Sequence, residues 1–314
     1  MRLTKAVLKY LQNPVFSKGL QEWKSRGKYF SFIGNDIFYM DEKGKGQEDA
    51  PLVLIHGYPT HSYDWKEMWP DLQNKFSRVI APDLFGFGFS AKPFRYYRIT
   101  DQASMIESLM EHLGVSTCHI LAHNYGDTVA QELLARHTDR QEGRTKTWEL
   151  KSMCFTNGGL FPETHVQMEF QRKCSKLITG FYHSYDYFYR GSVLRNVGGI
   201  FGRNSQPTEE MKNDMWFSIL YNNGERIQPL LLAYLAQRLK NRERWVGAMQ
   251  KTNVPLHMIH GRADPINPPP FEDHFRKTVP KSGLTVLPDI GHYPNLEAPE
   301  EVIEAYFNFL ESTK

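Results

Sequence analysis

The six residues from 122 to 127, Ala-His-Asn-Tyr-Gly-Asp, lie between two stretches of different periodicity. An apolar run at 118–122 predicts a buried strand, and apolar residues at helical spacing follow from 126 to 137. A strand that turns sharply into a helix raises one side chain above the sheet, and small neighbours such as Ala122 and Gly126 leave room for it. The sequence therefore predicts a tight strand–helix turn that presents Asn124.

The same alternation continues on both sides of this turn. Short apolar runs predict strands at 29–33, 36–40, 52–55, 79–81, 152–156, 255–260 and 284–287, and helical spacing predicts helices at 62–72, 100–113, 271–278 and 299–310. Such alternation indicates an α/β fold with a mostly parallel central sheet flanked by helices. Residues 159–248 interrupt it and are rich in aromatic residues, so we interpret them as an inserted helical cap. The predicted domains are a basic N-terminal segment at 1–28, a core at 29–158 and 249–314, and this cap.

Two polar residues at the ends of late strands form a set with Asn124. Asp264 follows the strand at 255–260, and His292 follows the strand at 284–287. Each has an ordinary explanation, because Asp264 precedes a proline in a turn and His292 is one of twelve histidines. Their order along the chain, however, is the order of nucleophile, acid and histidine that a catalytic triad takes on such a sheet. We therefore predict that Asn124, Asp264 and His292 occupy the catalytic positions.

Backbone N–H groups at two turns are the predicted oxyanion hole. The turn His56-Gly57-Tyr58 follows the strand at 52–55, and Tyr125 follows Asn124 directly. The N–H groups of Tyr58 and Tyr125 would stabilise negative charge that develops on a substrate oxygen. We interpret His56 as structural.

Aromatic residues are the predicted substrate contacts. The loop at 83–90 is interpreted as structural, with Phe85 or Phe87 touching the pocket, and residues 181–189 contain six aromatic residues in nine. Such a cluster either lines an apolar pocket and offers hydroxyl groups, or forms the internal face of cap helices. The predicted substrate-binding residues are Phe85, Tyr182, Tyr185, Tyr187 and Trp245.

These motifs resemble those of a known superfamily. HGYPTHSYDW at 56–65, PDLFGFGFS at 82–90, AHNYGD at 122–127, GRADPINP at 261–268 and IGHYPNLEAP at 290–299 resemble the α/β-hydrolase superfamily, and within it the branch of epoxide hydrolases and haloalkane dehalogenases. In that branch an aspartate usually attacks carbon, and a histidine oriented by an acid then activates water to hydrolyse the alkyl-enzyme ester. The resemblance implies that position 124 is the nucleophile, His292 the base and Asp264 the orienting acid, with an apolar small molecule or lipid-like compound as substrate.

The sequence departs from the pattern of that branch at three places. Position 124 is asparagine, and a neutral amide is a poor nucleophile. Tyr58 and Tyr125 occupy positions where haloalkane dehalogenases typically hold halide with Asn and Trp side chains, which disfavours dehalogenation. Trp245 is followed by Val246, where epoxide hydrolases usually have a proton-donating tyrosine. Epoxide opening would then depend on other tyrosines of the cap, namely Tyr182, Tyr185, Tyr187, Tyr189 or Tyr221.

Asn124 has two explanations. It is either an engineered change from aspartate that stalls turnover, or a natural residue in a protein that kept the pocket and lost or changed the chemistry. The leading hypothesis is an epoxide-hydrolase-like enzyme that Asn124 inactivates or strongly impairs. The alternatives are a catalytically inert ligand-binding protein on the same fold and a membrane-surface enzyme of lipid acyl chemistry. A serine esterase is disfavoured because position 124 is not serine.

Composition restricts the partners and the compartment. The net charge of +3 and the lack of a basic stripe with interleaved aromatics argue against nucleic acid. No metal-ligand spacing, phosphate loop or dinucleotide fingerprint occurs, so we expect no cofactor. Three separated cysteines predict reduced thiols in the cytoplasm.

Residues 1–30 carry seven basic residues and one acid. This charge pattern is typical of a solvated helix packed on the domain, or of peripheral contact with an anionic membrane through residues 1–20.

Overall fold

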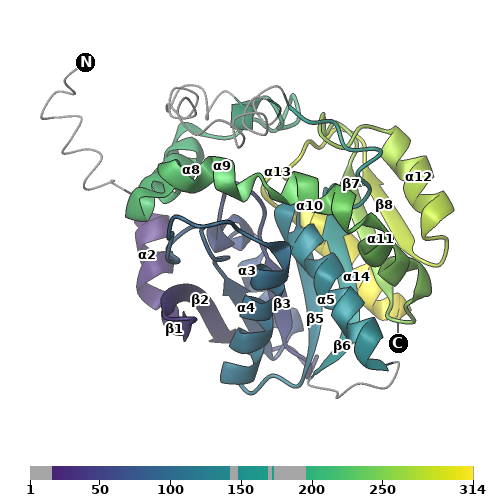
Figure 1. Ribbon diagram of the computed structural model, residues 1–314, viewed down its shortest axis with the longest axis horizontal. Coiled ribbons are helices and arrows are strands. Elements are labelled where there is room, and N and C mark those ends of the chain that lie inside the picture. The colour runs from purple at the N-terminus through teal and green to yellow at the C-terminus, as the bar shows by residue number, and fades with distance from the viewer. Residues whose placement is uncertain (1–15, 142–147, 169–171, 173–195, 314) are drawn as a thin grey trace, which may run out of the picture.

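An eight-stranded sheet forms the centre of the protein in the computed structural model, which describes residues 16–141, 148–168, 172 and 196–313 (Figure 1). The strands are β1 (Lys28–Phe32), β2 (Asn35–Lys43), β3 (Leu52–Ile55), β4 (Arg78–Pro82), β5 (Thr117–His123), β6 (Glu149–Thr156), β7 (Leu256–Gly261) and β8 (Gly283–Leu287). Their spatial order is β1-β2-β4-β3-β5-β6-β7-β8. Strand β2 pairs antiparallel with both β1 and β4, and the other five pairings are parallel. The predicted fold class is therefore confirmed.

Helices cover both faces of this sheet. They are α2 (Lys18–Arg26), α3 (Trp69–Lys75), α4 (Ile99–His112), α5 (Tyr125–Gln141), α8 (Glu209–Leu220), α9 (Gln228–Leu231), α10 (Tyr234–Lys240), α11 (Arg242–Lys251), α12 (Pro270–Thr278), α13 (Pro294–Glu297) and α14 (Pro299–Ser312), with 3-10 turns η1 (Ser62–Trp65) and η3 (Tyr221–Ile227). Strand β3 shows why both faces are covered. Val53 and Ile55 join the core under α4, α5 and α11, whereas Leu52 and Leu54 join the core under α2, α3 and α14.

Two helix starts differ from the prediction. The predicted helix at 62–72 is divided into η1 and α3. An α-helix tolerates proline in its first turn but not in its interior, so a new helix starts at Trp69, directly before Pro70, instead of one helix continuing through it. Helix α4 begins at Ile99 without a side-chain cap from Arg98. Its first N–H instead donates to Oε1 of Gln237 in α10 at 2.9 Å, so a helix distant in sequence takes the place of a local side-chain cap.

Helices α8, α9 and α10, which belong to the predicted cap, run across the upper half of Figure 1, with α8 and α9 at the left and α10 near the centre. Helix α8 begins after Thr208, whose hydroxyl accepts a hydrogen bond from the N–H of Met211, as the sequence predicts for a start at this position. Helix α11 continues past residue 248 and packs on α5 of the core. The division of the chain at 159 and 248 stays a prediction.

Lys92 joins the loop after β4 to helix α8. Its buried ammonium group donates to the carbonyl oxygens of Gly88 at 2.6 Å, of Ser218 at 2.8 Å and of Tyr221 at 2.8 Å. Gly88 belongs to the loop after β4, whereas Ser218 and Tyr221 belong to α8 and its C-terminus. The three donors of one lysine therefore satisfy carbonyl groups of two segments that lie more than 120 residues apart in the sequence.

Replacing Lys92 with methionine should lower the free energy of unfolding by about 3 kcal/mol, because three buried carbonyl oxygens lose a charged donor while the aliphatic contacts remain. Urea unfolding measures this difference. Lys18→Met is the control, because Lys18 is exposed and pairs only with Glu22. Equal loss in the two variants would mean that the Lys92 contacts add nothing to stability.

Several predicted features lie outside the described residues. These are the N-terminal residues 1–15, Cys174 and the cap tyrosines Tyr182, Tyr185 and Tyr187. From residue 16 onward the N-terminal segment packs on the domain: Trp23 is buried, and its Nε1 donates to Oγ of Ser62 at 3.1 Å. Cys118 and Cys154 are buried free thiols. Within the described ranges, no helix combines the length and hydrophobicity that a bilayer span requires.

Candidate active site

Asn124 lies at the tip of the turn between β5 and α5. Its φ of 52° is in the left-handed region, which asparagine tolerates better than most residues. The turn is also crowded, since a Cβ atom on Gly126 would approach the carbonyl oxygen of Ile55 to 2.2 Å. Glycine is therefore required at 126 for α5 to start so close to β3, and Asn124, two positions earlier, is held above the sheet in its left-handed conformation.

The side chain of Asn124 is held by two hydrogen bonds. The N–H of Tyr58 donates to Oδ1 at 3.0 Å, and Nδ2 lies 2.8 Å from Nε2 of His292. The amide is 3% exposed. Position 124, the predicted oxyanion donor Tyr58 and the predicted base His292 are therefore adjacent, although they are far apart in the sequence. Tyr125 provides the first N–H of α5, which has no partner within its own helix.

Asp264 holds the other nitrogen of the histidine. Nδ1 of His292 lies 2.8 Å from Oδ2 of Asp264. The same carboxylate accepts hydrogen bonds from the N–H of Ile266 at 2.8 Å, Nδ2 of Asn267 at 2.9 Å and Nδ2 of Asn157 at 3.0 Å. Burial raises the pKa of this carboxyl group, but nearby His292 and the surrounding donors outweigh that effect and lower the pKa to about 2.

These contacts define one set of protonation states. The ionised Asp264 can only accept, so Nδ1 of His292 carries the proton. Nε2 of the neutral ring then has a lone pair, which accepts the hydrogen bond from Nδ2 of Asn124. The base that would activate water is therefore occupied by the amide of Asn124.

Replacing Asp264 with asparagine should test the pKa of this carboxylate through protein stability. Its pKa falls from 3.8 to about 2 on folding, so the ionised form stabilises the fold by roughly 2.5 kcal/mol above about pH 4, and this is lost as the pH falls through about 2. We expect the difference in unfolding free energy between the wild type and Asp264→Asn to shrink by about 1 kcal/mol between pH 6 and pH 3. A difference that does not change with pH would contradict the assigned ionisation.

Three positioning residues were missed by the sequence analysis. Asn157 has a left-handed φ of 47°, and besides Asp264 it bonds the backbone of Gly261 and Gly291. Asn267 donates to Asp264, and Nε2 of His123 donates to the carbonyl oxygen of His292 at 2.8 Å. Asn157 and Asn267 follow β6 and β7 respectively, so polarity at the ends of parallel strands was the signal that would have identified them.

The structure places two predicted substrate contacts elsewhere. The ring of Phe85 packs against Phe32 and Tyr97, and its neighbour Phe87 instead packs against Tyr58 and Tyr125. Nε1 of Trp245 donates to Glu132 of α5 at 2.7 Å, because α11 packs along that helix. These contacts account for the burial of Phe85 and Trp245, and their contact with substrate stays a prediction. His56 is structural as predicted, since its Nε2 accepts the N–H of Leu84 at 2.9 Å.

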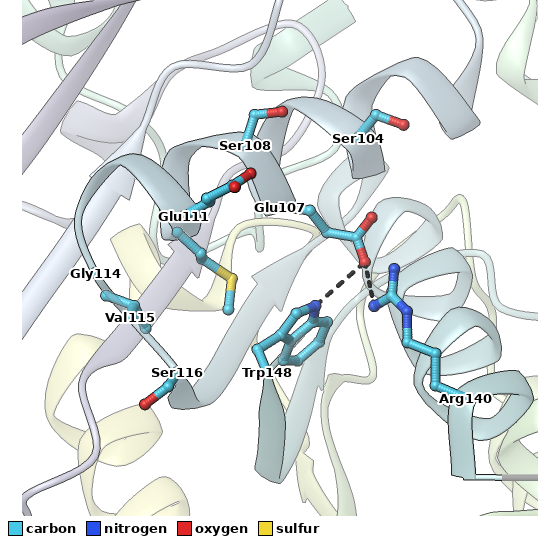
Figure 2. A pocket seen from close by; sticks show the side chains of 10 residues that line it. Ser104, Glu107, Ser108, Glu111, Gly114, Val115, Ser116, Arg140 and Trp148 are labelled. Atoms are coloured by element: carbon cyan, nitrogen blue, oxygen red, sulfur yellow. Dashed lines mark hydrogen bonds and ion pairs between the residues drawn. The ribbon is translucent and has the colours of Figure 1, made fainter. Parts of the chain in front are cut away.

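A cavity of about 550 Å³ lies at the opposite end of β5 (Figure 2). Residues of α4, of the segment 114–116 before β5, and Arg140 and Trp148 line it. Figure 2 shows the Glu107 carboxylate between Trp148 and Arg140, at 3.2 Å and 2.6 Å respectively. Because β5 separates this cavity from the turn at Asn124, it is not part of the candidate active site.

The sequence profile of the alpha/beta hydrolase family matches residues 52–305. This range contains the strand–helix turn, the acid and the histidine described above. The chain belongs to the α/β-hydrolase family.

Relatives of this α/β-hydrolase include the mesoderm-specific transcript protein of Mus musculus, which is 43% identical over 96% of this chain and 91% of the relative. The soluble epoxide hydrolase of a Corynebacterium strain is 40% identical over 80 residues, 26% of this chain and 28% of the relative. Among solved structures, haloalkane dehalogenase DbeA from Bradyrhizobium elkani superposes with a TM-score of 0.73 at 22% identity, covering 91% of this chain and 98% of that chain, which shows a shared fold.

Proposed function

We propose that this α/β-hydrolase has the catalytic framework of the aspartate-nucleophile, epoxide-hydrolase-like branch and takes an apolar small molecule or lipid-like compound at Asn124. The observation that carries the proposal is the position of the Asn124 side chain, between the N–H of Tyr58 and Nε2 of His292. An aspartate has the same shape, so it would place a carboxylate oxygen beside each group. The asparagine keeps that geometry and lacks the charge, so turnover should be absent or strongly impaired.

The second candidate function is ligand binding without catalysis. It is favoured by the hydrogen bond from Nδ2 of Asn124 to Nε2 of His292. In this arrangement Nδ2 of Asn124 donates to Nε2 of His292, and Nδ1 of His292 donates to Asp264, so each donor faces an acceptor. A protein that retained the pocket only to hold a ligand would be stable with this neutral set of groups.

Dehalogenation is the least favoured reaction of this branch. A halide leaving group needs N–H donors from side chains, and the residues at 58 and 125 are tyrosines. The ring of Tyr125 packs 5.1 Å from Phe87 and 4.8 Å from Tyr234 of α10. Among the described residues, Tyr234 is therefore the cap tyrosine in contact with this turn, which supports reactions that need a hydroxyl donor over those that need a halide site.

The test is a panel of epoxides, haloalkanes and esters with matched apolar bodies, assayed with the wild type and with Asn124→Asp. We expect the wild type to bind without turnover and Asn124→Asp to hydrolyse epoxides. Binding without turnover by both proteins would support the second candidate function. Hydrolysis of esters alone by both proteins would contradict the proposed nucleophile.

A further inference from the structure

Arg238 is a buried cation beside Asn124. It projects from cap helix α10 and is 2% exposed. Its Nε donates to Oγ1 of Thr128 at 2.7 Å, and Nη2 donates to the carbonyl oxygen of Asn124 at 3.2 Å. Its guanidinium lies 4.5 Å from the centre of the Tyr234 ring. Nη1 is buried and has no hydrogen-bond partner.

His165 presents two more unpartnered nitrogens at the same place. The side chain is partly exposed, but both ring nitrogens are shielded from solvent and make no hydrogen bond within 3.5 Å, and the side chain of Asn267 is the polar group close enough to act on the ring. A Cβ atom on Gly159 would come within 2.4 Å of Nη1 of Arg238 and 2.6 Å of Nδ1 of His165. The two side chains therefore converge over Gly159, where the absence of a side chain makes room for their polar atoms.

The charge of Arg238 lacks a direct counter-ion. Asp127 is the acid whose field acts on it, but burial raises the pKa of Asp127 well above its ordinary value, which favours the neutral carboxyl group. Within the described part of the chain, no carboxylate forms an ion pair with Arg238, and its hydrogen bonds go to one hydroxyl and one carbonyl group. Arginine stays protonated in proteins, and a buried charge without a partner is costly.

We propose that Arg238 and His165 bind a carboxylate group of the ligand, so that the ligand is an acid with an apolar body rather than a neutral molecule. Nη1 of Arg238 donates to one carboxylate oxygen and an N–H of His165 donates to the other. Since Arg238 also contacts the backbone of Asn124, the bound carboxylate lies beside the turn. This inference rests on the proposed function for the location of the ligand, and it specifies the chemical class of that ligand.

The experiment compares sodium octanoate with octanamide, which has the same apolar chain and no charge. Isothermal titration of the full wild-type chain should give a dissociation constant for octanoate at least about tenfold lower than for octanamide. Arg238→Gln should remove this preference, and Arg238→Lys should keep part of it because the charge remains. Arg242→Gln is the matched control, since Arg242 lies four residues later, is only partly buried, and pairs with Glu163 and Glu243 rather than with the turn at Asn124.

His165→Phe provides an independent variant if Arg238→Gln does not fold. It retains an aromatic ring and removes both nitrogens, and we expect several-fold weaker octanoate binding with octanamide binding unchanged. Equal affinity of the wild type for the two probes would overturn the proposal, as would an octanoate preference that survives in Arg238→Gln. These binding measurements do not depend on turnover, so they test the ligand class separately from the proposed function. If Asn124→Asp hydrolysed neutral epoxides while the wild type showed no preference for octanoate, the proposed function would stand and the carboxylate site would be wrong.

Discussion

Replacing Asn124 with aspartate should raise the rate of epoxide hydrolysis by at least about 10³-fold, from a wild-type rate near background. The substitution changes no shape, so the hydrogen bond from the N–H of Tyr58 should persist, whereas the carboxylate cannot donate to Nε2 of His292 and leaves that nitrogen free to act on water. It supplies the negative charge that attack on carbon requires, and the ester that forms can then be hydrolysed by water activated at His292. General-base catalysis alone typically contributes about 10²–10⁴-fold, and it cannot act until the ester exists.

Deamidation is the principal source of false activity in this experiment. Slow conversion of Asn124 to aspartate in the purified protein would produce a small active fraction and an increase of about 1 Da in intact mass. Freshly prepared wild type should therefore be analysed by mass spectrometry alongside the assay, and Asn124→Ala should remain inactive. If the wild type turned over substrate as fast as Asn124→Asp with no change in mass, residue 124 would not be the nucleophile.

Removing the base should separate the two chemical steps. In Asn124→Asp, a second change of His292→Gln should leave attack on carbon intact and slow ester hydrolysis by about 10²–10⁴-fold. A covalent adduct with the mass of the substrate should then accumulate on the peptide that contains position 124. Hydrolysis is the affected step because Nε2 of His292, oriented by Asp264, is the only nitrogen of that ring available to take a proton from water.

A histidine remote from the turn provides the control for this pair of changes. His257 bonds Thr285 between β7 and β8 and makes no contact with position 124, so Asn124→Asp with His257→Gln should turn over without accumulating adduct. If no adduct appears with any substrate that Asn124→Asp consumes, the two-step mechanism is wrong.

The sequence was most informative where one local pattern decides the structure. Each buried strand is a short apolar run between turn residues, so β3 and β5 could be located to within a residue or two. The turn at Asn124 was predictable because only small residues fit beside it, and Gly126 does meet the backbone of β3. The pairing of His292 with Asp264 followed from their places at the ends of β8 and β7, since parallel strands end at one edge of the sheet.

Contacts between distant segments could not be predicted. The first N–H of α4 is satisfied by Gln237, which lies 138 residues later, so no local pattern sets the start of that helix. Trp245 was expected at the substrate because it is a tryptophan near the end of the cap, but Glu132 binds its indole. Arg238 is one of many basic residues in the sequence, and only the packing of α10 on the turn shows that it is buried.

Helix α10 has a consequence for how the molecule exchanges its ligand. Gln237 bonds the start of α4, Arg238 bonds the turn at Asn124, and Lys92 bonds the end of α8. A rigid-body displacement of α8 and α10 would break all of these buried contacts together. Local opening of a shorter segment would therefore cost less free energy than displacement of the whole layer. Ligand entry by such partial opening would leave the hydrogen bonds of Asn124 and His292 in place throughout.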